Sequence, residues 1–201
     1  MGEHSRYSVS DAEGSGVLQN KLGITDQQKL DDVETLLLAD TYDHFFSLLQ
    51  KRKIHFDLAL LFEIHRFFLG TLYPWAGKLR TVDVSKDNVF FASVRFLDDS
   101  MKKFSTLLEV SQGHRTDTMP RIAEKLAVIH NELNALHPFR EGNGRTIRLF
   151  LDLMAVDAGY QPINWSKRSQ RTYLRACKNG METDHKPMTR FILAGLSKRR
   201  S

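Results

Sequence analysis

Apolar residues recur at helical spacing through most of this sequence. After Asp26, the residues Leu30, Val33 and Leu37 follow one another at intervals of three or four, the repeat of one face of an α-helix. The segment Thr25-Asp26-Gln27-Gln28 directly before them has the form of a capping box, in which Thr25 would be the N-cap. A long helix is therefore predicted to begin here.

The same spacing predicts further helices at about residues 58–69, 94–112, 118–136, 145–158, 167–179 and 186–196. Ser166 and Asp184 are the expected N-caps of the last two. Only residues 77–92 differ: Val, Thr and Phe alternate there around a Lys86-Asp87-Asn88 turn, which predicts a β-hairpin. The expected fold class is thus a mostly all-α helical bundle with one small β-hairpin.

Composition fits one soluble globular domain. The chain has 201 residues, of which 41% are hydrophobic and 26% charged, and this length does not require a second core. Residues 1–20 are rich in Gly and Ser and are expected to be irregular, with a single domain over 21–198. No apolar leader core or membrane span is expected, so the predicted location is the cytoplasm.

The net charge of the chain does not indicate a particular kind of binding partner. The net charge is +5, but the basic residues are dispersed and cluster only at 198–200, so no direct contact with nucleic acid is expected. Cys177 is the single cysteine; it cannot form an internal disulfide and is predicted to be a packing residue.

One segment, LHPFREGNGRTIR at residues 136–148, carries candidate chemistry. Pro138 disfavours helical geometry at His137, so the preceding helix should end there and expose the imidazole. Gly142 and Gly144 allow the backbone to turn so that successive N–H groups converge. The next helix begins nearby, and its N-terminal N–H groups and dipole favour a bound anion.

The charged residues of this segment favour a nucleotide. Arg145 and Arg148 lie three residues apart on one helix face, and each guanidinium can hold a phosphate bidentately. Glu141 would repel that phosphate unless a cation lies between them, and Mg²⁺ is such a cation. A base, a metal ligand and a phosphate cradle together indicate phosphoryl or nucleotidyl transfer, with His137 as the base.

Other kinds of site fit less well. A zinc site needs a second ligand at helical spacing from His137, whereas His130 is two turns away and forms no HExxH pattern. The Gly77-Lys78 pair is not preceded by the glycine that a P-loop requires. A simple connecting turn would explain each feature alone but not the complete set.

HPFREGNGRTIR matches in full the signature of the Fic family, His-Pro-Phe-x-(Asp/Glu)-Gly-Asn-Gly-Arg-x-x-Arg. Residues 72–92 resemble the approach helix and hairpin of that family, and residues 17–34 resemble the N-terminal segment of its short bacterial toxins. The resemblance implies a Fic-fold helical bundle. It also implies transfer of AMP from ATP to a Tyr, Ser or Thr hydroxyl of a target protein, with release of pyrophosphate.

The resemblance also implies roles for the reacting groups. His137 would be the general base that takes the hydroxyl proton. Glu141 would bind a Mg²⁺ that bridges the α- and β-phosphates of ATP, while Arg145 and Arg148 would hold the β- and γ-phosphates.

The remaining motif residues would shape the loop. Gly142, Asn143 and Gly144 would line the anion hole, Phe139 would anchor the loop in the core, and Pro138 would be structural.

By the same resemblance the hairpin is a flap that pairs with an extended target segment by strand addition. The flap residues are Ser85, Lys86, Asp87, Asn88, Val89 and Phe90. Tyr173 and Asn179 lie where relatives contact adenine.

The family is usually inhibited by a helix with the pattern (Ser/Thr)-x-x-x-Glu-(Gly/Asn), and this sequence holds no copy of it. A separate small antitoxin is therefore expected to supply that Glu to Arg148. The resemblance points to a type II topoisomerase subunit as the target. Two alternatives remain: transfer of another nucleotide or phosphate-containing group, and a non-catalytic helical domain that binds nucleotide or nucleic acid.

Overall fold

A computed structural model describes residues 17–86, 89–111 and 116–199. The expected irregular N-terminal segment lies largely outside these residues, but 17–20 contain no helix or strand. Asp87 and Asn88 of the hairpin turn also lie outside the described residues.

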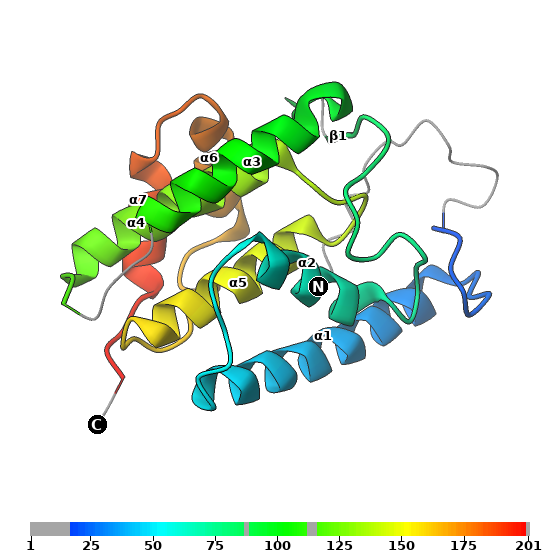
Figure 1. Cartoon of the computed structure of the whole chain (residues 1–201), viewed down its shortest axis with the longest axis horizontal. Helices are drawn as coiled ribbons and strands as arrows, with labels where there is room; N and C mark the ends of the chain where they lie inside the picture. The colour runs from blue at the N-terminus through cyan, green and yellow to red at the C-terminus, as the bar shows by residue number, and fades with distance from the viewer. Residues whose placement is uncertain (1–16, 87–88, 112–115, 200–201) are drawn as a thin grey trace.

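The described residues form helices and one two-stranded antiparallel hairpin, which confirms the predicted mostly α-helical class (Figure 1). The elements are α1 (Gln27–Gln50), α2 (Leu58–Leu69), β1 (Ser85–Lys86), β2 (Val89–Phe90), α3 (Val94–Ser111), α4 (Met119–Leu136), α5 (Asn143–Asp157), α6 (Gln170–Met181) and α7 (Lys186–Gly195).

Helix α5 is the centre of the bundle. It crosses the middle of Figure 1, with α1 along the lower edge and α3 and α4 above it, and it packs against α1, α2 and α4. Leu149, Phe150, Leu151 and Leu153 of α5 are all completely buried. Because α5 is held on several sides, its N-terminus, which carries the motif, has a fixed position in the molecule.

A second, smaller apolar cluster lies beside the motif. Its buried members are Leu30, Phe68, Leu69, Leu72, Tyr73 and Ala76. They join the start of α1 to α2 and to the segment after α2, and Val17 and Leu18 pack against them. This cluster fixes α1 relative to the N-terminal end of α5.

The helix starts differ slightly from the predicted ones. Asp26, not Thr25, is the N-cap of α1, and its carboxylate accepts a hydrogen bond from the Lys29 N–H (2.8 Å). Ser169, not Ser166, is the N-cap of α6, because its hydroxyl accepts a hydrogen bond from the N–H of Thr172 (3.3 Å). Ser166 lies in a preceding turn, where its N–H donates to Oδ1 of Asn164 (3.1 Å).

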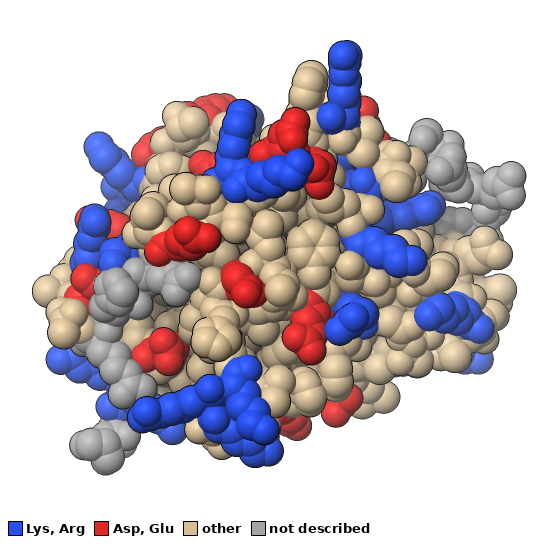
Figure 2. Space-filling view, in the orientation of Figure 1, with Lys and Arg blue, Asp and Glu red and all other residues tan. Residues whose placement is uncertain are grey.

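Charges of both signs are interspersed over the face shown in Figure 2. Within the described parts of the chain, no helix is long and apolar enough to cross a membrane.

Candidate functional site

His137 ends α4 in a left-handed backbone conformation, with φ of 47° and ψ of 60°. The sequence correctly predicts that the helix stops here, but the predicted exposure of the imidazole is wrong. His137 is only 4% exposed, because the ring of Phe91 stacks on it with 3.7 Å between centroids. The residue directly after the hairpin therefore covers the candidate base.

The hydrogen bonding of His137 fixes its tautomer. Nδ1 lies 3.2 Å from the carbonyl oxygen of Asn134, so Nδ1 carries the proton and Nε2 is the basic nitrogen. Burial, together with the smaller effects of the Arg80 and Lys86 cations, lowers the pKa of His137 to about 3. The imidazole is therefore neutral near pH 7, as a general base must be.

Arg80 fastens the hairpin to the end of α4, a role that sequence reasoning missed. Its side chain is fully buried and donates to the carbonyl oxygens of His137 (2.8 Å), Leu136 (3.3 Å), Val82 (2.8 Å) and Ala92. Carbonyls at a helix C-terminus favour a cation. An arginine within an alternating strand pattern gave no signal of this function.

The side chain of Asn143 is part of the loop. Its Oδ1 accepts from the N–H of Phe139 (2.9 Å), and its Nδ2 donates to the carbonyl of Phe139 (2.7 Å). Asn143 and Phe139 are both fully buried, and Pro138 accepts through its carbonyl from the N–H of Arg80. Only the backbone of Asn143 is therefore placed to line an anion site.

His65 of α2 holds the motif loop through hydrogen bonds, a role that was not predicted from the sequence. Its Nδ1 accepts from the N–H of Gly77 (2.8 Å), so Nε2 carries the proton and donates to the carbonyl of Glu141 (2.9 Å). The imidazole stacks on Phe139 with 3.8 Å between centroids. Burial lowers the pKa of His65 to about 4, so this support is a neutral imidazole.

The two motif glycines differ in backbone conformation and in the space around them. Gly142 has φ of +79°, and a Cβ there would lie 2.7 Å from Cδ1 of Leu69. Gly144 is inside α5, and the nearest atom to a Cβ there would be Nη1 of Arg148 at 3.9 Å. The prediction that both glycines serve the turn is therefore right for Gly142 and wrong for Gly144.

Glu141 lies directly before the N-terminus of α5. Its Oε1 accepts from the N–H of Gly142 (2.9 Å) and lies 3.5 Å from Nη2 of Arg145. Burial raises the pKa of Glu141, while these two donors oppose that effect. The described residues contain no group of three His, Cys, Asp or Glu that could hold a metal by themselves. A single carboxylate such as that of Glu141 is one of the ligand sets that Mg²⁺ takes in proteins, where substrate phosphates and water complete its coordination.

The two motif arginines contact different parts of the molecule. Nη1 of Arg145 lies 2.5 Å from Oε2 of Glu34 on α1, and its guanidinium lies 4.9 Å from the ring centroid of Phe68. The guanidinium of Arg148 lies 6.0 Å from the ring centroid of Tyr173 on α6. They flank the N-terminal turns of α5 on two sides.

Tyr173 belongs to an aromatic group beside Arg148. Its hydroxyl lies 2.9 Å from Nε2 of His130, and its ring meets that of Trp165 edge to face. Asn179 lies nearly two turns further along α6, where its carbonyl accepts from the N–H groups of Glu182 and Asp184. Its contact with adenine stays a prediction.

The hairpin presents a short edge next to His137. Ser85 pairs with Phe90 and Lys86 with Val89. The side chain of Phe90 is 80% exposed, whereas Lys86 is partly buried and lowers the pKa of both His137 and Glu141. Lys86 thus points its charge toward the motif while Phe90 faces solvent.

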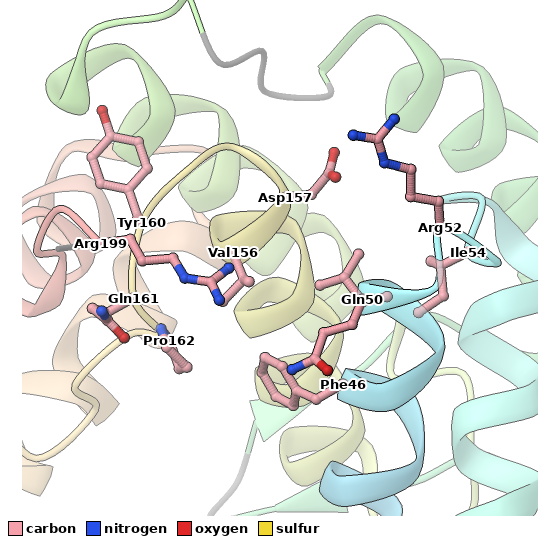
Figure 3. Close-up of a pocket in the computed structure, with 11 residues that line it drawn as sticks. Phe46, Gln50, Arg52, Ile54, Val156, Asp157, Tyr160, Gln161, Pro162 and Arg199 are labelled. Carbon is pink, nitrogen blue, oxygen red and sulfur yellow. The ribbon is translucent and has the colours of Figure 1, made fainter. Parts of the chain in front are cut away.

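A cavity of about 880 Å³ lies at the other end of α5 (Figure 3). Phe46, Tyr160 and Pro162 line it together with Arg52 and Arg199. It contains no motif residue, and the 15 residues of α5 separate it from the motif by roughly 20 Å. It is not the candidate site.

Several known proteins are similar to this chain. Residues 55–155 match the Fic/DOC family. The chain is 38% identical over 176 residues to the protein adenylyltransferase VbhT of Bartonella schoenbuchensis, covering 87% of this chain and 36% of VbhT. It is 30% identical to the probable protein adenylyltransferase y4lH of Sinorhizobium fredii, covering 89% of this chain and 91% of y4lH. The chain thus spans about a third of one relative and nearly all of the other.

Solved structures share the fold. The Bartonella tribocorum effector BepC with bound AMPPNP superposes with a TM-score of 0.76 at 22% identity, covering 94% of this chain and 96% of BepC. The N-terminal Fic domain of a Bartonella quintana Bep effector with bound ADP gives 0.77 at 24% identity, with 94% of each chain covered.

Proposed function

Because this chain belongs to the Fic/DOC family, we propose that it is a protein adenylyltransferase that transfers AMP from ATP to a hydroxyl of a target protein. The observation that carries this proposal is the state of His137. It is a neutral imidazole whose Nδ1 is held by the carbonyl of Asn134, which leaves Nε2 as the base. The curated relatives VbhT and y4lH have the same activity in their names.

In the proposed reaction, Nε2 of His137 takes the proton from the target hydroxyl. The hydroxyl oxygen then bonds to the α-phosphorus of ATP, the bond from that phosphorus to the bridging oxygen breaks, and pyrophosphate leaves. The first N–H groups of α5, which have no side-chain cap, and its dipole are suited to the phosphate charge. Arg145 and Arg148 flank the same end of the helix.

We include ATP as substrate and Mg²⁺, held through Glu141, as cofactor. When bound, the cation would neutralise phosphate charge and orient the leaving group. The target segment would add as a strand to the hairpin edge at Ser85–Lys86 and Val89–Phe90, and its hydroxyl would then face His137. Its residue would be Tyr, Ser or Thr, in the cytoplasm, with a type II topoisomerase subunit as first candidate.

The test is incubation of the protein with cell lysate and ATP labelled at the α- or, separately, the γ-phosphate. We expect α-label on a protein target. Label from γ-ATP only would instead support phosphate transfer, and no label from either would support a binding domain. His137→Ala should abolish labelling, whereas His55→Ala, which removes an exposed histidine, should not. Circular dichroism of each variant controls for folding.

We further propose that a small antitoxin inhibits the enzyme by supplying a Glu to Arg148. The support is that the sequence has no inhibitory pattern of its own and that Arg148 lies at the edge of the motif, near Tyr173. Co-expression with the neighbouring gene should yield a complex in which labelling is suppressed. An isolated chain already as inactive as its complex would contradict this proposal.

A further inference from the structure

Glu34 is a buried carboxylate that the motif alone does not explain. It lies on α1, before the segment that matches the family, and is only 6% exposed. A buried charge is stable only when it is paired and hydrogen-bonded. Both of its oxygens are used: Oε1 accepts from the hydroxyl of Tyr73 (2.8 Å), and Oε2 accepts from Nη1 of Arg145 (2.5 Å).

Arg145 has two possible acid partners. Glu141 lies four residues earlier in the chain, an arrangement that favours pairing along a helix. The distance from Nη2 of Arg145 to Oε1 of Glu141 is nevertheless 3.5 Å, a full ångström longer than the contact with Glu34. The shorter, charge-assisted contact decides where the guanidinium lies.

The residues packed around Arg145 fix its guanidinium in this position. The guanidinium of Arg145 lies over the ring of Phe68 (4.9 Å), which is completely buried. Tyr73 is itself 1% exposed and stacks on Trp75 with 4.4 Å between centroids. Arg145 is thus held by residues of α1, of α2 and of the segment after α2.

The position of Arg145 affects how much of the charge of Glu141 is neutralised. Glu34, Glu141 and Arg145 together carry a net charge of −1 if both acids are ionised, and Glu34 takes up the charge of Arg145. Arg145 then neutralises the Glu141 carboxylate less completely than a short ion pair would, which favours a cation at Glu141. With an uncharged side chain at position 34, Arg145 would be attracted mainly to Glu141. The positive charge of Arg145 would then neutralise the negative charge of Glu141.

We infer that Glu34 and Tyr73 are positioning residues that draw Arg145 toward Glu34, leave it only a long 3.5 Å contact with Glu141, and so keep Glu141 available to a divalent cation. This inference rests on the proposed function, because the cation is the Mg²⁺ that accompanies ATP. Neither residue touches the substrate; both act through Arg145.

The test measures Mg²⁺-dependent binding of a non-hydrolysable ATP analogue by calorimetry, without any turnover. Glu34→Gln keeps the shape of the side chain and should raise the Mg²⁺ concentration for half-maximal binding about tenfold, the effect of losing one charge-assisted hydrogen bond. Tyr73→Phe should shift it in the same direction by less. Asp32→Asn, an exposed neutralisation on the same helix, should leave it unchanged.

In AMP transfer, Glu34→Gln should raise the apparent KM for Mg²⁺ while kcat at saturating Mg²⁺ changes little, a split that general loss of structure would not produce. An unchanged Mg²⁺ requirement in both variants would overturn the inference while leaving the proposed function standing. Absence of Mg²⁺-dependent binding by the unchanged protein would overturn both.

Discussion

At the scale of the residue, the position of the candidate base depends on Arg80. Its guanidinium donates hydrogen bonds to four backbone carbonyls, two at the end of α4 and two in the hairpin segment. The planar fork of arginine can satisfy several carbonyls at fixed angles, which the single ammonium of lysine cannot. Burial lowers the pKa of Arg80, but the side chain stays charged because arginine titrates far above neutral pH.

We expect Arg80→Lys to destabilise the protein by about 3 kcal/mol, because buried carbonyls lose their donors. AMP transfer should fall as well, since the carbonyl of His137 is one of them. Urea unfolding measures the first effect. Arg121→Lys is the matched control, because Arg121 is exposed and, among the residues that the structure describes, is paired only with the nearby Glu124. Its effect should stay within about 0.5 kcal/mol. Equal unfolding midpoints for the two variants would refute this role for Arg80.

The sequence predicted the motif residues but not their supports. His137, Glu141 and the two arginines form a contiguous pattern, whereas His65 and Arg80 reach it from other elements. A weak signal existed for Glu34, which lies on the apolar face of α1 between Leu30 and Thr41, all three of them buried. A charged residue on such a face needs a partner, but only the structure shows that the partner is Arg145.

At the scale of the element, α5 joins a turn that requires glycine to a helix that does not. The period of apolar residues predicted this helix and its end: Gly159, with φ of +93°, follows its C-cap Ala158. The start was placed two residues late, because the helix already includes Asn143 and Gly144. Periodicity describes packed helix interiors well, whereas helix ends depend on local hydrogen bonds such as those of Asp26 and Ser169.

The two glycines of the motif should therefore respond differently to alanine. Gly142→Ala should cost about 3 kcal/mol of stability, because it combines a left-handed backbone with a contact to Leu69. Gly144→Ala should be neutral or stabilise the protein by about 0.5 kcal/mol, since alanine favours helix. If the backbone at Gly144 must approach a phosphate, this stable variant should still lose nucleotide binding.

Urea unfolding and calorimetric titration with the ATP analogue separate the two effects. Similar losses of stability from Gly142→Ala and Gly144→Ala would contradict this account of the turn. A Gly144→Ala protein that binds the analogue normally would show that the second glycine has no part in phosphate binding.

At the scale of the whole molecule, a series of hydrogen bonds joins α4 to α6 and to the start of α7. The Tyr173 hydroxyl donates to Nε2 of His130, and Nδ1 of His130 donates to Oδ1 of Asn131 (3.3 Å). Nδ2 of Asn131 in turn donates to Nδ1 of His185 (2.9 Å). A side chain at Gly180 would overlap the Asn131 amide. The position of Tyr173 beside Arg148 is thus set by the packing of three helices, which no local sequence pattern reports.

This network makes stability depend on pH. Burial lowers the pKa of His130 to about 4; the bond to Asn131 opposes this shift, and the Arg148 cation adds to it. In the unfolded chain the pKa is about 6.5. Between these values the unfolded chain binds more protons than the folded chain, so His130 lowers the stability as the pH falls through this window.

We expect the free energy of unfolding to fall more steeply from pH 7 to pH 5 in the unchanged protein than in His130→Gln, by about 2 kcal/mol. Glutamine cannot titrate, and it can still accept from Tyr173 and donate to Asn131. Urea unfolding at pH 7, 6 and 5 gives the two slopes. Their difference cancels the effects of His65, His137 and the buried Asp152, whose pKa burial raises to about 6, because both proteins retain these residues. Parallel slopes would mean that His130 takes up its proton in the folded chain as readily as in the unfolded one. The buried network between α4 and α6 would then have to open well below the free energy of global unfolding.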